Sequence, residues 1–352
     1  MKYIMGDAGM SRVRECDWIR TICTIMIVIF HMGEISIWPW RFFYKNGSLG
    51  TVAVTMFFML SGGVLYYNNR EINSIKKFYI KRWKAIFPAY YVAYFPAWFD
   101  RISLVGRIFW RGHLPFVLSL IGMDGYFSYR IKGYYEVGEW FLGCIILMYI
   151  FYPIIIKLIN SLGCFTLVIE IVIHYFLVVR LDIFVIGDSW NLLTWIMPFC
   201  LGMIFFKYEL WDKRILLYCS LIMFFFFTFF DVPIDTLYAC MIYGVSMFFI
   251  IWKIAANHVG RVKILDSIID RISYLSYGIF LVHHVIIYRI SPLYSNMHGI
   301  KKAILFIICW GLIFIYADVV TFLGKAWMNY AEKIIQKYMN SSKLKLNGQR
   351  EK

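Results

Sequence analysis

Ten apolar runs, most of them long enough to cross a lipid bilayer, follow one another along this chain and constrain its fold more than any other feature. A transmembrane helix needs about 20 apolar residues, because its backbone polar groups must be satisfied inside the lipid. Hydrophobic residues make up 61% of the chain, whereas soluble domains contain roughly 45–50%. The runs lie near residues 18–38, 48–67, 84–100, 136–157, 164–180, 190–207, 214–230, 236–253, 272–290 and 302–324. We therefore predict an all-α fold, a polytopic transmembrane bundle of about ten helices.

The charged segments between the runs predict how the bundle is oriented. An even number of spans places both termini on one side of the membrane. If that side is cytoplasmic, the inner segments hold 24 of the 36 Lys and Arg residues and the outer segments hold 11. The positive-inside rule favours this arrangement. The net charge of +15 thus belongs to membrane loops, and we expect membrane lipids rather than nucleic acid as partners.

Two segments lie outside this pattern of spans. We expect residues 1–340 to form a single transmembrane domain and residues 341–352 to be a short polar cytoplasmic tail, which the composition predicts to be disordered. The stretch 114–123 is too short to span the membrane, and we expect it to be re-entrant or interfacial. The sequence carries no signal for an oligomeric state.

A stripe of polar residues runs along the first predicted helix. At about 100° per residue, the step from Arg20 to His31 turns the helix by about 1100°, so the two residues share one face, about 16.5 Å apart along the axis. Asp17 lies one turn before Arg20 on this face, and Thr24 lies on it too. The stripe therefore leads from the cytoplasmic rim to deep inside the bilayer.

An ionisable group such as His31 is costly at that depth, so it should face the bundle interior or a wet cavity with a partner. Glu34 lies one turn further on and is the candidate partner. A contact with Glu34 would fix the imidazole tautomer and raise its basicity, as a general base for a hydroxyl group requires. The alternatives are a structural histidine that packs helix 1 against a neighbour and an interfacial ion pair of Asp17 with Arg20.

The second helix carries Ser61, Gly62 and Gly63 in the middle of its apolar run. Small residues in a membrane helix permit two backbones to approach closely. The alternative interpretation is a helix break beside a ligand, where the freed backbone groups line a cavity. In that interpretation Ser61 contributes to a cofactor site.

A basic cluster, KKFYIKRWK (76–84), precedes Pro88 at the predicted cytoplasmic mouth of the third helix. It agrees with the positive-inside rule and could bind anionic lipid headgroups. Arg82, with its fork-shaped guanidinium, could equally hold a phosphorylated cofactor, assisted by Lys81 and Lys84. The sequence does not separate these interpretations.

Later helices contribute further candidates. Glu139 lies near the outer end of the fourth helix, beside Trp140, which is a candidate interfacial anchor. His283 and His284 lie in the middle of the ninth apolar run. Because adjacent helical residues point about 100° apart, we expect at most one of the two to face the same cavity as His31. No His, Cys and carboxylate set shows the spacing of a zinc site, so the sequence predicts no metal.

Taken in order, these stretches resemble the motifs of the integral-membrane acyltransferase 3 family, whose bacterial members mostly O-acetylate cell-surface polysaccharides. The similar segments are Asp17 to Arg20 with His31 eleven residues later, FFMLSGGVL (57–65), Arg82 to Pro88, WFLGCIILMYIFYP (140–153, which includes Trp140 and Tyr149) and SYGIFLVH (276–283). The resemblance covers most of the chain. It implies a bundle of about ten helices in the bacterial plasma membrane.

The resemblance also implies an acyl-CoA donor that enters from the cytoplasm, and an acceptor sugar that arrives from outside or within the membrane. The donor is acetyl-CoA by resemblance, and succinyl-CoA stays open, as does the choice between a surface polysaccharide and a lipid-linked precursor. Two positions depart from the family pattern. Ala85 stands where a second arginine is usual, which leaves Lys81 or Lys84 to supply the charge. Ile145 stands where a glutamate is frequent, for which Glu139 could substitute.

Together these observations predict a membrane-bound O-acyltransferase. The cofactor phosphates would bind Arg82 and the lysines, with Arg20 at the entrance. His31, poised by Glu34 or by the hydrogen-bond network of Asp17, would deprotonate a sugar hydroxyl or itself take the acyl group. His283, Trp140 and Tyr149 are substrate-contacting or structural residues. The alternatives are a transporter or flippase of surface-polysaccharide precursors and a purely structural membrane scaffold.

Overall fold

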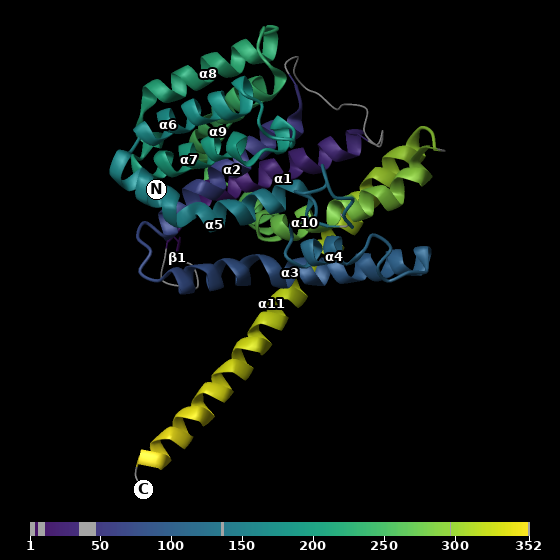
Figure 1. Cartoon of the computed structure of the whole chain (residues 1–352). Helices are drawn as coiled ribbons and strands as arrows, with labels where there is room; N and C mark the ends of the chain where they lie inside the picture. The colour runs from purple at the N-terminus through teal and green to yellow at the C-terminus, as the bar shows by residue number, and fades with distance from the viewer. Residues whose placement is uncertain (1–3, 6–10, 35–46, 135–136, 296, 351–352) are drawn as a thin grey trace.

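The computed structural model describes all residues except 1–3, 6–10, 35–46, 135–136, 296 and 351–352, and only the backbone of residues 4, 5, 11, 34, 139, 295 and 338–350. Almost every element of this part is helical (Figure 1). The α-helices are α1 (Arg14–Glu34), α2 (Leu49–Asn68), α3 (Ile75–Val105), α4 (His113–Leu120), α5 (Glu139–Leu162), α6 (Phe165–His174), α7 (Leu192–Lys207), α8 (Arg214–Phe229), α9 (Thr236–His258), α10 (Lys263–Ser295) and α11 (Ile300–Arg350). Shorter elements are the antiparallel strands β1 (Ile4–Met5) and β2 (Ser11–Arg12), a π-helical turn (Tyr175–Arg180) and two 3-10 turns (Asp188–Trp190 and Leu210–Asp212).

Each of the ten predicted runs overlaps one of these helices, which confirms the all-α fold class. By length and composition five of the described helices, α1, α2, α5, α9 and α11, are able to cross a membrane, and α7 and α8 are shorter apolar helices. The number of spans and the side on which the termini lie stay predictions. The short stretch 114–123 forms α4.

The structure contradicts one alternative interpretation and one expectation about local structure. Helix α2 runs without a break through Ser61, Gly62 and Gly63, so the proposed helix break beside a ligand is absent. The polar tail from residue 341 continues α11 as helix to Arg350 instead of being disordered. In Figure 1 this end of α11 projects away from the bundle. Helix propagation adds one hydrogen bond per residue to an existing helix, which favours continuation into a polar segment without Pro.

Helix α2 lies at the centre of the bundle, in contact with α1, α7 and α9. It crosses α7 with the two backbones in direct contact. A Cβ atom added at Gly62 would collide with the carbonyl of Phe199, and one added at Gly202 would collide with the carbonyl of Met59. The interpretation of the small residues as a site of close helix approach is confirmed.

Helices α1 and α10 lie side by side and run in the same direction. Near their N-terminal ends, Arg14 contacts Asp266 and Asp270, and Thr21 donates a hydrogen bond of 3.1 Å to the carbonyl of Ile269. Further along both helices, His31 contacts His283 and His284 of α10. Helix α10 therefore packs against α1 along the whole length of the polar stripe, as far as His31.

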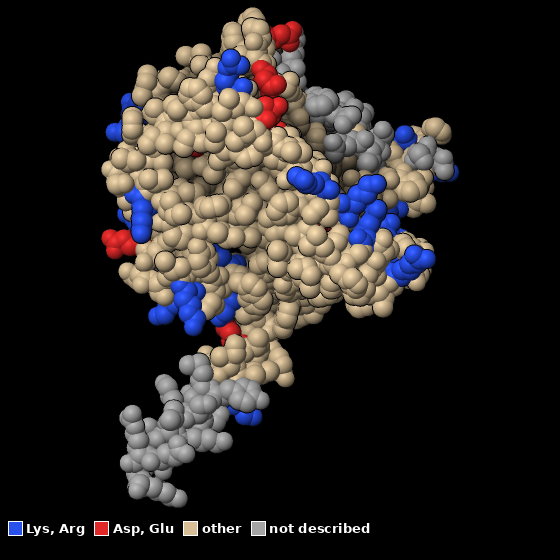
Figure 2. Space-filling view, viewed as in Figure 1, with Lys and Arg blue, Asp and Glu red and all other residues tan. Residues whose placement is uncertain are grey.

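The surface of the bundle is suited to lipid. Figure 2 shows that Lys, Arg, Asp and Glu gather mainly toward the ends of the helices, with an uncharged band between them. Large apolar side chains are exposed along this band, among them Ile154, Phe165, Phe225 and Ile307. In water such a surface would be unfavourable, so the chain is a multi-pass membrane protein.

Candidate active site

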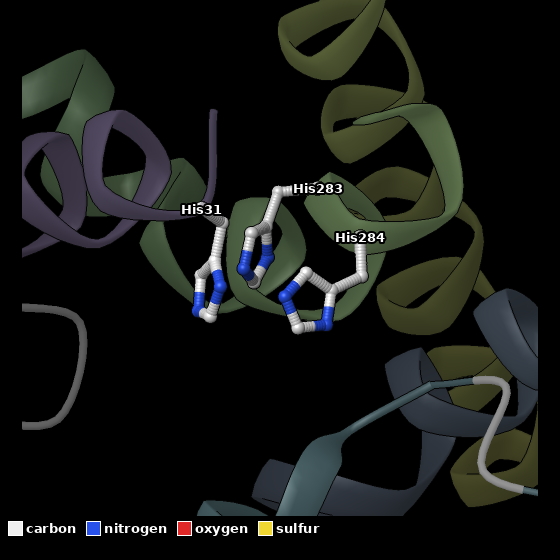
Figure 3. A group of neighbouring side chains, drawn as sticks. All are labelled: His31, His283 and His284. Atoms are coloured by element: carbon white, nitrogen blue, oxygen red, sulfur yellow. The ribbon is translucent and has the colours of Figure 1, made fainter. Parts of the chain in front are cut away.

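Three imidazoles form a compact cluster in the interior of the bundle (Figure 3). His31 comes from α1, and His283 and His284 come from α10. The ring centroid of His31 lies 4.1 Å from that of His284 and 5.2 Å from that of His283, and the two α10 rings are 4.5 Å apart. His283 is fully buried, whereas His31 and His284 are partly exposed to a cavity.

The expectation that at most one of His283 and His284 faces the same cavity as His31 is confirmed, because His284 lines a cavity together with His31 and the fully buried His283 does not. Both rings nevertheless contact the ring of His31. The direction from α10 to His31 lies between the two side chains, so residues about 100° apart on the helix both reach it. Helical spacing alone does not reveal this, since it depends on where α1 crosses the face of α10.

The backbone fixes the tautomer of His283. Its Nδ1 atom lies 2.8 Å from the carbonyl oxygen of Phe280 and 3.1 Å from that of Ile279. Carbonyl oxygens only accept hydrogen bonds, so Nδ1 carries the proton and Nε2 carries the lone pair. His283 therefore presents a hydrogen-bond acceptor within the cluster, which suits a residue that positions a neighbouring imidazole.

The cluster borders a cavity of about 340 Å³, the histidine cavity. Its walls are largely aromatic and include Trp140, Trp190, Trp195 and Tyr288, with polar groups from His31, His284, Ser48, Thr51 and Ser189. Trp195 is fixed by a hydrogen bond of 3.0 Å from its Nε1 to the carbonyl of Ser189 and by stacking on Phe58. Trp195 is thus held in place in the cavity wall, and Trp140 packs against it with ring centroids 5.7 Å apart.

A second cavity of about 360 Å³, the arginine cavity, lies beside the first. Arg20, Ser61, Arg82 and Tyr149 are among its lining residues. The guanidinium of Arg82 lies 5.6 Å from the ring centroid of Tyr149 and 5.8 Å from that of Phe78. Its enclosed Nε atom has no hydrogen-bond acceptor among the described residues. Because Arg82 lines the cavity, its guanidinium is placed to bind an incoming anion.

Arg20 is held at this cavity by a buried carboxylate. Its Nη1 atom donates to Asp17 at 3.0 Å and to the hydroxyl of Ser273 at 2.9 Å. Ser273 in turn donates to Asp17 at 2.6 Å, and Arg12 donates to the other carboxylate oxygen at 2.7 Å. Asp17 lies fourteen residues before His31, about 21 Å along the helix, so it holds Arg20 rather than the imidazole.

The remaining sequence candidates fall into three groups. Trp140 borders the histidine cavity, and Tyr149 and Ser61 border the arginine cavity. Lys81 and Lys84 lie on the exposed face of α3 and outside the arginine cavity, where Lys84 pairs with Glu332 at 2.7 Å. The side chains of Glu34 and Glu139 lie outside the described residues.

The structure also adds residues that the sequence did not single out. Trp190, Trp195 and Tyr288 border the histidine cavity, and Phe57, Phe141 and Phe280 border both cavities. These residues lie in apolar helices or beside them, where an aromatic side chain is ordinary packing material. Only the position of each helix in the bundle distinguishes a cavity wall from a lipid-facing ring.

Among the described residues, the three imidazoles form a group that could hold a metal ion, whereas the absence of a metal expected from sequence spacing stays a prediction. Their candidate ligand atoms lie within 4.8 Å of one another. Nitrogen ligands lie about 2.0–2.1 Å from zinc, which in a tetrahedral site brings them to roughly 3.4 Å from each other. The rings would therefore have to close around an ion, while the carbonyl-bound His283 already has the orientation of a zinc ligand.

Comparison with known proteins agrees with this architecture. The model of the family described as "Acyltransferase domain" matches residues 13–326. "Acyltransferase MdmB" of Streptomyces mycarofaciens is 28% identical over 120 residues, which are 33% of this chain and 30% of that protein. The match thus spans less than a third of the curated relative. No solved structure matches the chain. Because the family match includes α1, α10 and both cavities, the chain belongs to the acyltransferase 3 family.

Proposed function

We propose that this membrane acyltransferase moves an acyl group, acetyl in the first instance, from acyl-CoA to a hydroxyl of a cell-surface polysaccharide or its lipid-linked precursor. The main observation in support of this proposal is that one face of α1 borders two adjoining cavities, with Arg20 in one and His31 in the other. Guanidinium groups bind phosphates, and an imidazole is a base for a hydroxyl. The two chemical requirements of the reaction are met in neighbouring spaces.

The donor occupies the arginine cavity, whose mouth faces the cytoplasm of the bacterium in the orientation favoured by the positive-inside rule. The phosphates of acyl-CoA bind Arg82 and Arg20. Arg20 is held in place by Asp17 and Ser273. Arg20 and His31 are about 16.5 Å apart along α1. A long and narrow donor arm is therefore needed to carry the thioester to the imidazoles.

The acceptor occupies the histidine cavity. Its tryptophan side chains, Trp140, Trp190 and Trp195, offer flat apolar surfaces on which the C–H face of a sugar ring can stack, as amphipathic rings favour. A third cavity of about 570 Å³ shares Phe280, His284 and Tyr288 with it and is bordered by Arg101 and Arg289. This vestibule is the route by which the acceptor arrives from the other face.

His31 takes the proton of the sugar hydroxyl while the oxygen attacks the thioester carbonyl carbon. The carbon–sulfur bond breaks, and the leaving thiolate receives the proton from the imidazolium, so that the ester and the free thiol of CoA are the products. His283, whose Nδ1 proton is bound by backbone carbonyls, positions the cluster. The desolvated site supplies rate through orientation of donor and acceptor.

Thiol release from acetyl-CoA by the purified protein in liposomes, with acetylation of the polymer as second readout, tests this function. His31→Ala should lower thiol release by about 10²–10⁴-fold, the usual contribution of a general base. His258→Ala is the control, because this imidazole lies on α9, outside both cavities. Full activity of His31→Ala would exclude the mechanism.

The donor site is tested by the KM for acyl-CoA. Arg82→Ala should raise it about tenfold or more, because a charge-assisted hydrogen bond contributes about 1.5–3 kcal/mol. Lys84→Ala should leave it unchanged, since Lys84 pairs with Glu332 on the outside. A transporter or flippase of polysaccharide precursors would move its substrate without releasing thiol, and failure of the wild-type protein to release thiol with any acceptor would favour that alternative.

A further inference from the structure

Three phenylalanines border both the arginine cavity and the histidine cavity. Phe57 comes from α2, Phe141 from α5 and Phe280 from α10. The ring centroids of Phe141 and Phe280 are 5.4 Å apart, and those of Phe57 and Phe141 are 6.0 Å apart. These are ordinary contact distances between aromatic rings. The three rings therefore form the partition between two spaces that both contain ionisable groups.

A permanently open passage at this point would harm the cell. The arginine cavity and the histidine cavity lie in series along α1, and the vestibule continues beyond the imidazoles. A column of water through the three cavities would conduct protons, which His31 and His284 would accept and pass on. A narrow apolar constriction excludes water and so interrupts conduction.

We propose that Phe57, Phe141 and Phe280 form an aromatic neck that closes against water when no donor is bound, and whose width limits the length of the acyl group that reaches His31. The closure follows from the cavities alone. The limit on acyl length rests on the proposed acyl-CoA donor.

Of the three rings, Phe280 is the one that also has free space beside it. Phe141 is supported by Phe58, with ring centroids 4.7 Å apart. Phe280 instead borders the vestibule as well, a space of about 570 Å³. A change of rotamer can therefore carry its ring out of the neck toward existing space.

Proton leak through the protein tests the closure without reference to catalysis. The full chain is reconstituted in liposomes with an imposed pH gradient and an internal pH-sensitive dye. Phe280→Ala and Phe141→Ala should raise the leak rate at least about tenfold over wild type, because removing a ring opens the constriction to water. Phe224→Ala is the matched control, since this ring stacks on Tyr243 away from both cavities.

A second substitution guards against misfolding as the cause of a leak. Phe280→Trp keeps the neck filled and should retain the gradient, so a leak confined to the smaller side chains supports the closure. Wild-type tightness in both alanine variants would overturn it, as would an equal leak in Phe224→Ala.

The acyl-length limit is measured as the ratio of kcat/KM for butyryl-CoA to that for acetyl-CoA. Phe280→Ala should raise this ratio about tenfold or more, because each methylene that a pocket excludes is worth about 1–3 kcal/mol in discrimination. Phe280→Trp should lower it. A ratio unchanged in both variants would overturn the limit. If the wild-type protein releases no thiol from any acyl-CoA, the proposed function fails, while the leak experiment still decides the closure.

Discussion

Removing the charge of Asp17 should destabilise the protein more than removing the charge of a surface carboxylate that also forms an ion pair. Asp17 is 4% exposed and accepts hydrogen bonds from Arg12, Arg20 and Ser273. Asp17→Asn keeps the shape of the side chain but leaves one acceptor oxygen and no charge. The positive charge of Arg20 then lies in the bundle without its counter-charge. Removing one partner of a buried ion pair lowers stability strongly, because the remaining charge is left uncompensated.

The structure allows the size of the effect to be worked out bond by bond. The side chain of Arg12 is 42% exposed, so its pair contributes at most about 1 kcal/mol. Arg20 is 29% exposed, and its charge-assisted bond contributes about 1–2 kcal/mol after allowance for solvent. The Ser273 hydrogen bond adds about 1 kcal/mol. We expect the free energy of unfolding to fall by about 2–4 kcal/mol.

The measurement is denaturant unfolding in mixed micelles, with wild type and Asp318→Asn in parallel. Asp318 forms an ion pair of 3.0 Å with Arg271, but the two side chains are 47% and 56% exposed, so its loss should cost at most about 1 kcal/mol. The KM for acyl-CoA should also rise in Asp17→Asn, because Arg20 is no longer fixed at the cavity. Equal stability of the two variants would refute the account of Asp17 as a buried clamp.

Three further predictions follow from close contacts. Gly202→Ala should destabilise the bundle by about 1–3 kcal/mol in the same unfolding assay, because its Cβ would collide with the Met59 backbone. Gly311→Ala is the control, because a Cβ at that position meets nothing within 4 Å. Equal losses of stability in the two variants would contradict the close crossing of α2 and α7. His283→Phe keeps the ring but removes the acceptor, and should lower kcat about tenfold or more with little change in the KM for acyl-CoA; a shifted pH profile would separate positioning of His31 from loss of packing. Micromolar Zn²⁺ should inhibit thiol release by occupying the imidazoles, and a chelator should restore it, whereas insensitivity to Zn²⁺ would show that the rings do not close around an ion.

The helices and the polar face of α1 could be predicted from the sequence, because both depend on local periodicity. Apolar runs of membrane length impose helices wherever they occur. The eleven-residue step from Arg20 to His31 is a property of one helix, and both side chains do line adjoining cavities. The same reasoning placed Arg82 at a cavity and was less successful with Lys81 and Lys84, whose directions differ from that of Arg82 by about 100° and 200°.

The imidazole cluster and the aromatic neck could not be predicted, because they depend on which helices meet. His31 and His284 are separated by most of the chain, and nothing in either local pattern specifies how α1 lies against α10. Phe57, Phe141 and Phe280 come from three helices that are far apart in the sequence and contain many apolar residues. Their shared position between two cavities is a property of the assembled bundle alone.

Helix α10 contributes a residue to each part of the proposed reaction path, namely the arginine cavity, the aromatic neck and the imidazole cluster. Ser273 binds Arg20, Phe280 belongs to the neck, and His283 and His284 contact His31. These residues span about 16.5 Å of one continuous helix. A helix moves as a stiff rod. A slide or rotation of α10 caused by a nucleotide bound near Ser273 would therefore shift Phe280 and the imidazoles of His283 and His284 at the same time. Arrival of the donor and readiness of the base would then be one mechanical event.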